Sequence, residues 1–190
     1  MFFRDNPLLW IWAFFGLLWL FPAAFAKRTI QKQGTGARIV QLALLVAAYA
    51  LLTDVKLGWP ILDRRVLPQG PAVLIAGYSL LAAGMAFALW ARIHLSGNWS
   101  SNVTLKEDHT LIRSGPYRFV RHPIYTGLLI AVLGTAIVLG GEVRGFLGLI
   151  LAGIAWKYKS SKEEVLMVQR FGDLYTRYRT EVKGLVPYIW

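Results

Sequence analysis

The charged residues of this 190-residue chain gather in short clusters, and the stretches between the clusters are uncharged. A helix rises about 1.5 Å per residue, so about 20 uncharged residues cross the hydrocarbon core of a bilayer. The shorter stretches need helix extension into the headgroup layer, or local thinning, to cross it. The pattern predicts an all-α, polytopic membrane protein with about five transmembrane helices. The five uncharged stretches cover residues 6–26, 39–53, 66–91, 123–141 and 145–156.

The last two stretches are separated by a link so short that they predict a tight antiparallel helical hairpin. The helix of the fifth stretch is expected to continue past the membrane into the lysine-rich segment that follows it. Residues 171–182 place their apolar side chains on one helical face, which predicts an amphipathic helix. We therefore expect one integral membrane domain over residues 1–190. Residues 1–91 would hold three spans, and residues 92–190 a polar connection, the hairpin and the amphipathic helix.

Lysine and arginine are distributed unevenly between the two ends of this predicted bundle. The connections 27–38 and 92–121 and the tail 157–183 carry 16 of the 21 basic residues, and the other connections carry 5. The positive-inside rule then puts the N-terminus outside, and the polar connection and the C-terminus in the cytosol. The short stretch 39–53 leaves open whether the second span crosses fully.

Charge and composition exclude several classes of site. The net charge of +11 fits basic loops that face an anionic lipid leaflet, whereas no basic face with interleaved aromatic residues on a soluble fold suggests nucleic acid. With no cysteine in the chain, disulfides, thiolate nucleophiles and cysteine-ligated metals are excluded. His94, His109 and His122 have no spacing that fixes a ligand geometry, so we expect no metal site.

Residues 114–127 combine a Gly-Pro turn, three basic side chains and two tyrosines at the start of the fourth uncharged stretch. Pro123 stands where the first residue of a helix needs no hydrogen-bonded N–H. Polar and aromatic residues of 98–112 precede this segment, and the tail brings residues 159–164 to the same predicted side. These features predict a polar pocket at the cytosolic mouth of the bundle, suited to a small charged cofactor with an adenine and an amino-acid end. They do not by themselves predict a reaction.

Each of these residues also has a simpler interpretation when it is taken alone. Arginines beside a span are often headgroup anchors, a His-Pro pair often only begins a helix, and tyrosines often form interfacial belts. Adjacent glutamates usually lie on a solvated helix face. The residues concerned are Arg118, Arg121, His122, Pro123, Tyr117, Tyr125, Glu163 and Glu164.

Taken together and in order, the motifs of the second half of the chain resemble the isoprenylcysteine carboxyl methyltransferase family and its phospholipid-methyltransferase relatives. The resemblance covers residues 98–187, and the first two predicted helices carry no comparable match. Its motifs are His109-Thr-Leu-Ile112, Gly115-Pro-Tyr117, Arg121-His-Pro-Ile-Tyr125-x-Gly127, Glu163-Glu164, and Phe171-Gly-x-x-Tyr175-x-x-Tyr178 followed by Val186-Pro187.

This resemblance implies an S-adenosylmethionine-dependent membrane methyltransferase whose cofactor binds at the cytosolic face without a Rossmann domain. Lys159 stands where the eukaryotic members have an arginine that contacts substrate, and Asn102 stands where they have glutamine. A lysine does not clamp a carboxylate with a bidentate fork, so the prenylcysteine carboxylate is not fixed as the substrate. The implied cofactor contacts are Asn102, His109, Thr110, Leu111, Ile112, Tyr117, His122, Pro123, Ile124, Tyr125 and Glu163.

The reaction implied is in-line transfer of a methyl group to an oxygen or nitrogen of a lipophilic or lipid-modified acceptor. A carboxylate acceptor needs no general base and a protonated amine does, so no catalytic base is assigned. A second enzyme class is an NADPH-dependent membrane reductase like the sterol reductases, which share a related C-terminal arrangement. A non-enzymatic membrane scaffold is a third hypothesis, although the hairpin spans lack the buried ionisable residues that mark transport paths.

Overall fold

A computed structural model describes residues 7–20, 29–32, 35–53, 59–95, 104–106 and 111–187 of the chain. Helices dominate these residues, as the sequence predicts. The elements in chain order are α1 (Pro7–Leu20), β1 (Thr29–Lys32), α2 (Thr35–Leu52), α3 (Pro71–Leu95), β2 (Thr104–Lys106), the 3₁₀ helix η3 (Gly115–Arg118), α4 (Pro123–Val138), α5 (Val143–Phe171) and α6 (Asp173–Glu181).

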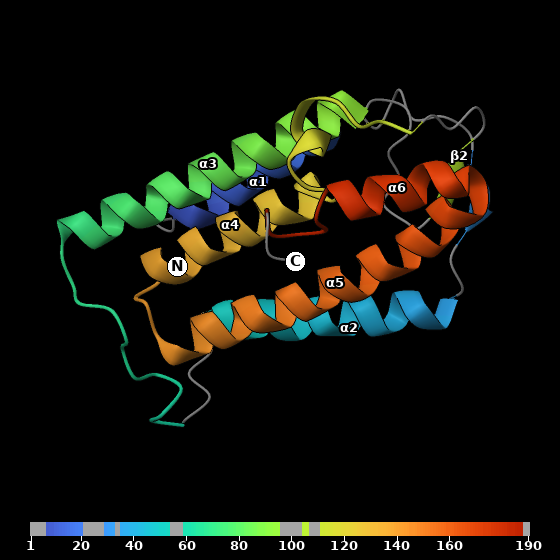
Figure 1. Cartoon of the computed structure of the whole chain (residues 1–190). Helices are drawn as coiled ribbons and strands as arrows, with labels where there is room; N and C mark the ends of the chain where they lie inside the picture. Colours follow the sequence, from blue (N-terminus) through green and yellow to red (C-terminus); the bar gives the residue numbers. More distant parts are fainter. Residues whose placement is uncertain are drawn as a thin grey trace.

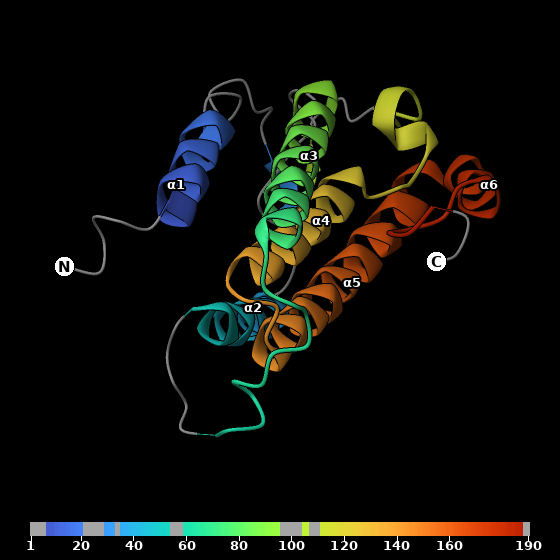
Figure 2. The same cartoon turned by 90° about the vertical axis from the view of Figure 1, so that its left-hand side faces the viewer.

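The helices pack side by side in a bundle (Figure 1). α3 runs against α4, while α5 packs against both α4 and α2. α1 covers the face of α3 that points away from α5, as Figure 2 shows, and contributes the buried side chains Leu8 and Phe15 to a cluster with Leu81 and Met85 of α3. α4 and α5 form the predicted hairpin, and α5 continues well beyond its apolar part, also as predicted.

Glycines bring the backbones of α3 and α4 into direct contact. A Cβ atom added to Gly127 of α4 would lie 2.6 Å from both the Ala88 nitrogen and the Gly84 oxygen of α3. Lipid gives helices no hydrophobic reason to associate, so van der Waals contact between small residues has to hold them together. Gly148 of α5 makes a comparable contact, because its Cβ would lie 2.9 Å from the carbonyl oxygen of Ala48 in α2.

The connections of the bundle lie at two opposite ends. At one end, β1 pairs with β2 in an antiparallel two-stranded sheet, which joins the α1–α2 connection to the α3–α4 connection. At the other end, Arg65 forms a β-bridge with Glu142, and the buried Arg144 pairs with Glu142 at 2.6 Å. The sequence correctly places these two groups of connections at opposite ends, whereas the small sheet is a departure from the all-α prediction.

One described helix, α3, is both long and apolar enough to cross a membrane by itself. α1, α2 and α4 are shorter apolar helices, so the number of five crossings stays a prediction. α6 is amphipathic as expected, but its apolar face packs inward: Tyr175 and Tyr178 are buried, while Leu174 is half exposed. The apolar side of α6 therefore serves mainly to attach this helix to the protein.

The contact between α3 and α4 predicts that Gly134→Ala destabilises the bundle. The new Cβ would lie 2.5 Å from the carbonyl oxygen of Gly77 and would also press on the backbone of Leu81, which cannot move aside as a side chain can. Overpacking of this kind costs about 1–3 kcal/mol, and we expect the melting temperature in detergent to fall by about 4 °C or more.

Gly153→Ala in α5 is the matched control, because its Cβ would meet only Leu129 Cδ2, at 3.7 Å. Alanine forms helix better than glycine by about 1 kcal/mol, so this variant should melt at the same temperature as the wild type or higher. Equal melting temperatures for the two variants would contradict the close α3–α4 contact.

Candidate functional site

The segment before α4 reaches the end of the bundle through a tight turn at Gly115. Gly115 has φ +58°, which a residue with a side chain rarely adopts, and a Cβ there would lie 2.8 Å from the imidazole of His94. Pro116 continues this turn into η3, and Pro123 begins α4 with His122 at the N-cap. The turn therefore presents His122 and the first turn of α4 to α5.

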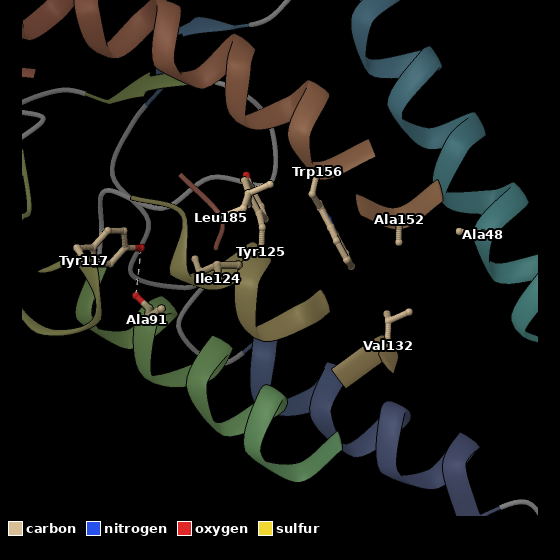
Figure 3. Packing of buried hydrophobic residues seen from close by; sticks show 9 residues of the cluster. All are labelled: Ala48, Ala91, Tyr117, Ile124, Tyr125, Val132, Ala152, Trp156 and Leu185. Carbon is tan, nitrogen blue, oxygen red and sulfur yellow. Dashed lines mark hydrogen bonds between the residues drawn. The ribbon is translucent and has the colours of Figure 1, made fainter. Parts of the chain in front are cut away.

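Three aromatic rings stack where α4 meets α5. The ring of Tyr125 lies nearly parallel to the imidazole of His122, with centroids 5.7 Å apart and planes at 13°. Trp156 of α5 also lies nearly parallel to the Tyr125 ring, with centroids 6.4 Å apart and planes at 5° (Figure 3). Nζ of Lys159 lies 5.4 Å from the centre of the Tyr125 ring, so the buried lysine shares the same wall.

Glu163 lies one helical turn beyond Lys159 and meets this stack. Its Oε1 accepts a hydrogen bond of 2.6 Å from the Tyr125 hydroxyl and lies 4.0 Å from Nζ of Lys159. Its Oε2 lies 3.5 Å from Nδ1 of His122. Burial opposes ionisation, but the His122 hydrogen bond and the Lys159 charge outweigh it and hold the pKa of Glu163 below its ordinary value.

Glu164 makes a second, separate set of contacts. Its Oε1 accepts hydrogen bonds from Arg121, at 3.0 Å from Nε and 2.6 Å from Nη2, and lies 3.1 Å from Nε2 of His122. Burial disfavours the charged carboxylate, but the hydrogen bonds from His122 and Arg121 dominate and lower the pKa of Glu164 to about 2. Glu164 is therefore an anion at every physiological pH.

His122 lies between the two carboxylates and is itself buried. Burial alone would lower the pKa of its imidazole, but the hydrogen bonds to Glu163 and Glu164 outweigh burial and raise that pKa above its ordinary value. The ring is thereby favoured in its charged form, with both N–H groups directed at carboxylate oxygens.

The C-terminal segment forms the outer support of this site. The backbone N–H of Arg121 donates to the Lys183 carbonyl at 2.8 Å, and that of His122 donates to the Gly184 carbonyl at 3.0 Å. The hydroxyl of Thr126 donates to the Leu185 carbonyl at 2.6 Å. α6 and the segment after it therefore hold the start of α4 in place through backbone hydrogen bonds.

The structure brings His122, Tyr125, Glu163 and Lys159 into mutual contact. Tyr117 lies farther off: its side chain is buried, its hydroxyl donates to the Ala91 carbonyl at 3.4 Å, and its own carbonyl accepts from the Tyr178 hydroxyl.

Several other predicted cofactor contacts lie around this group. Pro123 and Ile124 are buried in the first turn of α4, and Ile112 is packed against the same cluster, with Leu111 before it in the chain. The remaining predicted contacts, Asn102, His109 and Thr110, lie outside the described residues.

Sequence reasoning names none of Trp156, Arg121, Glu164 and Thr126 as a cofactor or substrate contact. Trp156 is the last residue of an uncharged stretch. Its position one helical turn before Lys159 puts both side chains on one face of α5. Arg121 and Glu164 were visible in the motifs, but nothing in a sequence pairs two residues 43 positions apart. Among the described residues, no group of His, Asp and Glu side chains is arranged to hold a metal ion.

Residues 76–169 of the chain match the model of the isoprenylcysteine carboxyl methyltransferase (ICMT) family. A Schizosaccharomyces pombe protein-S-isoprenylcysteine O-methyltransferase is 40% identical over 86 residues, which cover 44% of this chain and 35% of that protein. Protein-S-isoprenylcysteine O-methyltransferase B of Arabidopsis thaliana is 31% identical over 163 residues, covering 84% of this chain and 76% of that protein.

The fold also has a counterpart among solved structures. The eukaryotic intramembrane Ras methyltransferase ICMT superimposes with a TM-score of 0.54 at 19% identity, covering 84% of this chain and 55% of that chain. This chain thus matches about a third of the fission-yeast relative, about half of the solved structure and three quarters of the plant relative. With a family-model match across the helical hairpin and a plant relative that is similar over most of its length, the chain belongs to the isoprenylcysteine carboxyl methyltransferase family.

Proposed function

We propose that this protein is a membrane methyltransferase that uses S-adenosylmethionine to methylate the carboxylate of a lipophilic, prenylcysteine-like acceptor. The observation that carries the proposal is the contact set of His122, Tyr125, Glu163 and Lys159 at one end of the bundle.

The groups of the site fit the chemistry of S-adenosylmethionine. Glu163 offers an ionised carboxylate in a largely buried place, which suits a cationic centre or ribose hydroxyls. His122 stays a proposed cofactor contact through its ring carbons, because both of its nitrogens already meet carboxylates. The rings of Tyr125 and Trp156 supply flat apolar surface of the kind on which an adenine packs. Asn102, His109 and Thr110 remain part of this proposed cofactor site.

The cofactor supplies a methyl group that is already activated by its sulfonium. The work left to the protein is to bind, to orient and to exclude water, and well-oriented reactants can account for about 7–11 kcal/mol of a barrier. Glu163 is held by three side chains from two helices, which is the rigid support that such positioning needs.

The described site residues are poorly suited to removing a proton. Glu163 and Glu164 have lowered pKa values and are occupied by donors, so both are weak bases. Both nitrogens of His122 face these carboxylates, so neither is free to take a proton from an acceptor. A carboxylate acceptor needs no deprotonation, whereas a protonated amine does. This balance favours O-methylation, in agreement with the names of the relatives.

Lys159 is the proposed contact for the acceptor carboxylate. It is buried beside the stack, where a positive charge can approach an anion without competition from water. An ammonium acts as a point charge and does not impose the planar, two-pronged geometry of a guanidinium. We therefore propose that the site tolerates a wider range of lipophilic carboxylates than one with an arginine at this position.

The proposed arrangement in the membrane follows from the distribution of basic residues. The N-terminus lies outside, and the site and the C-terminus lie at the cytosolic surface. The pairing of β1 with β2 supports this, because it unites two of the basic connections at the end of the bundle where the site lies. Residues 1–91 and 92–190 then form one integral membrane domain with five spans.

Binding of S-adenosylmethionine to the purified protein in detergent tests the cofactor directly. We expect a rise in melting temperature and a calorimetric signal with S-adenosylmethionine and neither with NADPH. Glu163→Gln should weaken binding about tenfold or more, because it replaces a charge-assisted acceptor with a neutral one. Tyr125→Ala should weaken it as well. Stabilisation by NADPH alone would instead support a reductase.

Lys159→Ala separates the acceptor from the cofactor. We expect the affinity for S-adenosylmethionine to stay within about threefold of the wild type, while methyl transfer to a prenylcysteine carboxylate falls by about tenfold or more. Lys159→Arg is the matched control and should retain transfer, because it preserves the charge. Equal loss of affinity and transfer in Lys159→Ala would place Lys159 in the cofactor site instead.

A further inference from the structure

Glu163 and Glu164 are neighbours in sequence but meet different partners. Glu163 faces the aromatic stack and Nδ1 of His122, whereas Glu164 faces Nε2 of the same ring. Glu164 also receives both Arg121 nitrogens through Oε1, and its Oε2 lies 3.4 Å from Nε of Arg179 in α6. Glu163 therefore contacts the aromatic stack, and Glu164 joins the His122 imidazole to the C-terminal part of the chain.

Contacts at both nitrogens and at one ring face restrict the rotation of the His122 imidazole. Its two nitrogens face two different carboxylates, and its flat face lies against Tyr125. Its backbone N–H is held by the Gly184 carbonyl. The contacts at the two ring nitrogens decide where the imidazole points. Glu163 supplies the contact at Nδ1, and Glu164 supplies the contact at Nε2.

Arg121 ties the same carboxylate to the C-terminal segment. Besides Glu164, its Nη1 donates to the carbonyl of Arg179 at 3.2 Å and to that of Val182. The Arg121–Glu164 pair is well buried, with side-chain exposures of 10% and 15%. Two charge-assisted hydrogen bonds to one carboxylate oxygen in such a buried place hold the pair in a more defined geometry than an exposed pair has. The position of Glu164 is therefore set by both α5 and the end of α6.

We propose that Glu164 is a positioning residue of the cofactor site: it holds the His122 imidazole against Tyr125 and toward Glu163, from a clamp that also fastens α6. The identity of the ligand rests on the proposed function, whereas the contacts of Glu164 do not.

The charge of His122 depends on groups from every element around it. The two carboxylates of α5 favour a positive charge on the ring. Each carboxylate also meets cations: Glu163 meets Lys159 of α5, and Glu164 meets Arg121 and Arg179. The charged and titratable groups around the imidazole and its two carboxylates are Arg121, Tyr125, Lys159, Glu163, Glu164 and Arg179.

Removal of the Glu164 charge should therefore lower the pKa of His122. A raised pKa stabilises the folded protein at pH values below the unfolded pKa of about 6.5, and this stabilisation is lost as the pH rises through the folded pKa. In Glu164→Gln this stabilisation should be smaller, and it should be lost completely at a lower pH than in the wild type.

The test is NMR titration of histidine-labelled full-length protein in detergent, combined with calorimetric titration of S-adenosylmethionine between about pH 5.5 and 8.5. For Glu164→Gln we expect the pKa of His122 to fall by about one unit or more, and the affinity at pH 7.5 to fall about tenfold or more. Glu164→Asp withdraws the carboxylate from Nε2 while it keeps the charge, so it should give a smaller change in the same direction.

Glu181→Gln is the matched control. Glu181 also fastens α6, through an ion pair with Arg113, but its side chain is 55% exposed and does not touch His122. This variant should leave both the His122 pKa and the affinity unchanged.

An unchanged His122 pKa in folded Glu164→Gln, or in Glu164→Asp if the first variant does not fold, would reduce Glu164 to a structural latch and overturn the proposal. A shifted His122 pKa in a protein that binds no S-adenosylmethionine would overturn the proposed function and leave the positioning role in place.

Discussion

Two consecutive carboxylates on α5, Glu163 and Glu164, lie where the bundle ends, and the surrounding fold is arranged to neutralise them. An uncompensated buried charge costs several kcal/mol, so each carboxylate has to be met by donors. Consecutive helical residues point about 100° apart, so the donors must come from more than one element. α4 and the connection before it supply Tyr125, His122 and Arg121, and α6 approaches from the outside. The site is thus also what joins α4, α5 and α6 at this end.

This requirement explains why so short a helix as α6 is held firmly. Isolated helices of nine residues are marginal in water, and the described part of α6 gains its stability from contacts. Tyr178 donates to the carbonyl of Tyr117, Arg113 lies over the Tyr178 ring with its guanidinium 5.1 Å from the ring centre, and Glu164 meets the last turn through Arg179. The apolar face of this amphipathic helix serves to attach it to the rest of the protein.

The helices of the fold are predictable because local sequence features mark where each begins and how long it is. Pro71 and Pro123 mark the starts of α3 and α4, and the uncharged stretches mark their lengths to within a few residues. Gly77 and Gly84 lie on the face of α3 that packs closely against α4. The pairing of β1 with β2 was not predictable, because strands of four and three residues carry no usable periodicity and their register depends on a partner more than 70 positions away.

The site, too, has residues that the sequence predicts and residues that only the structure shows. The cluster of His122, Tyr125 and Glu163 follows from ordered motifs, since each residue lies at the membrane end of a predicted helix. Tyr117 stays a predicted cofactor contact, and its buried hydroxyl donates to the backbone of α3. Trp156 was missed because a tryptophan at the end of a span is usually an interfacial anchor, and only the position of Tyr125 in space shows that the two rings stack.

The helices outside the family-model match still bear on the site. α2 lies outside the matched residues 76–169, yet Ala48 packs directly against Gly148 and Ala152 in α5. α5 carries Lys159 and both glutamates beyond that contact, so α2 helps to fix the direction in which α5 leaves the bundle. α3 does the same for α4 through Gly127. Two close backbone contacts, α3 with α4 and α2 with α5, therefore set the geometry of the stacked rings. A change in either contact would be transmitted along a rigid helix to the charged groups.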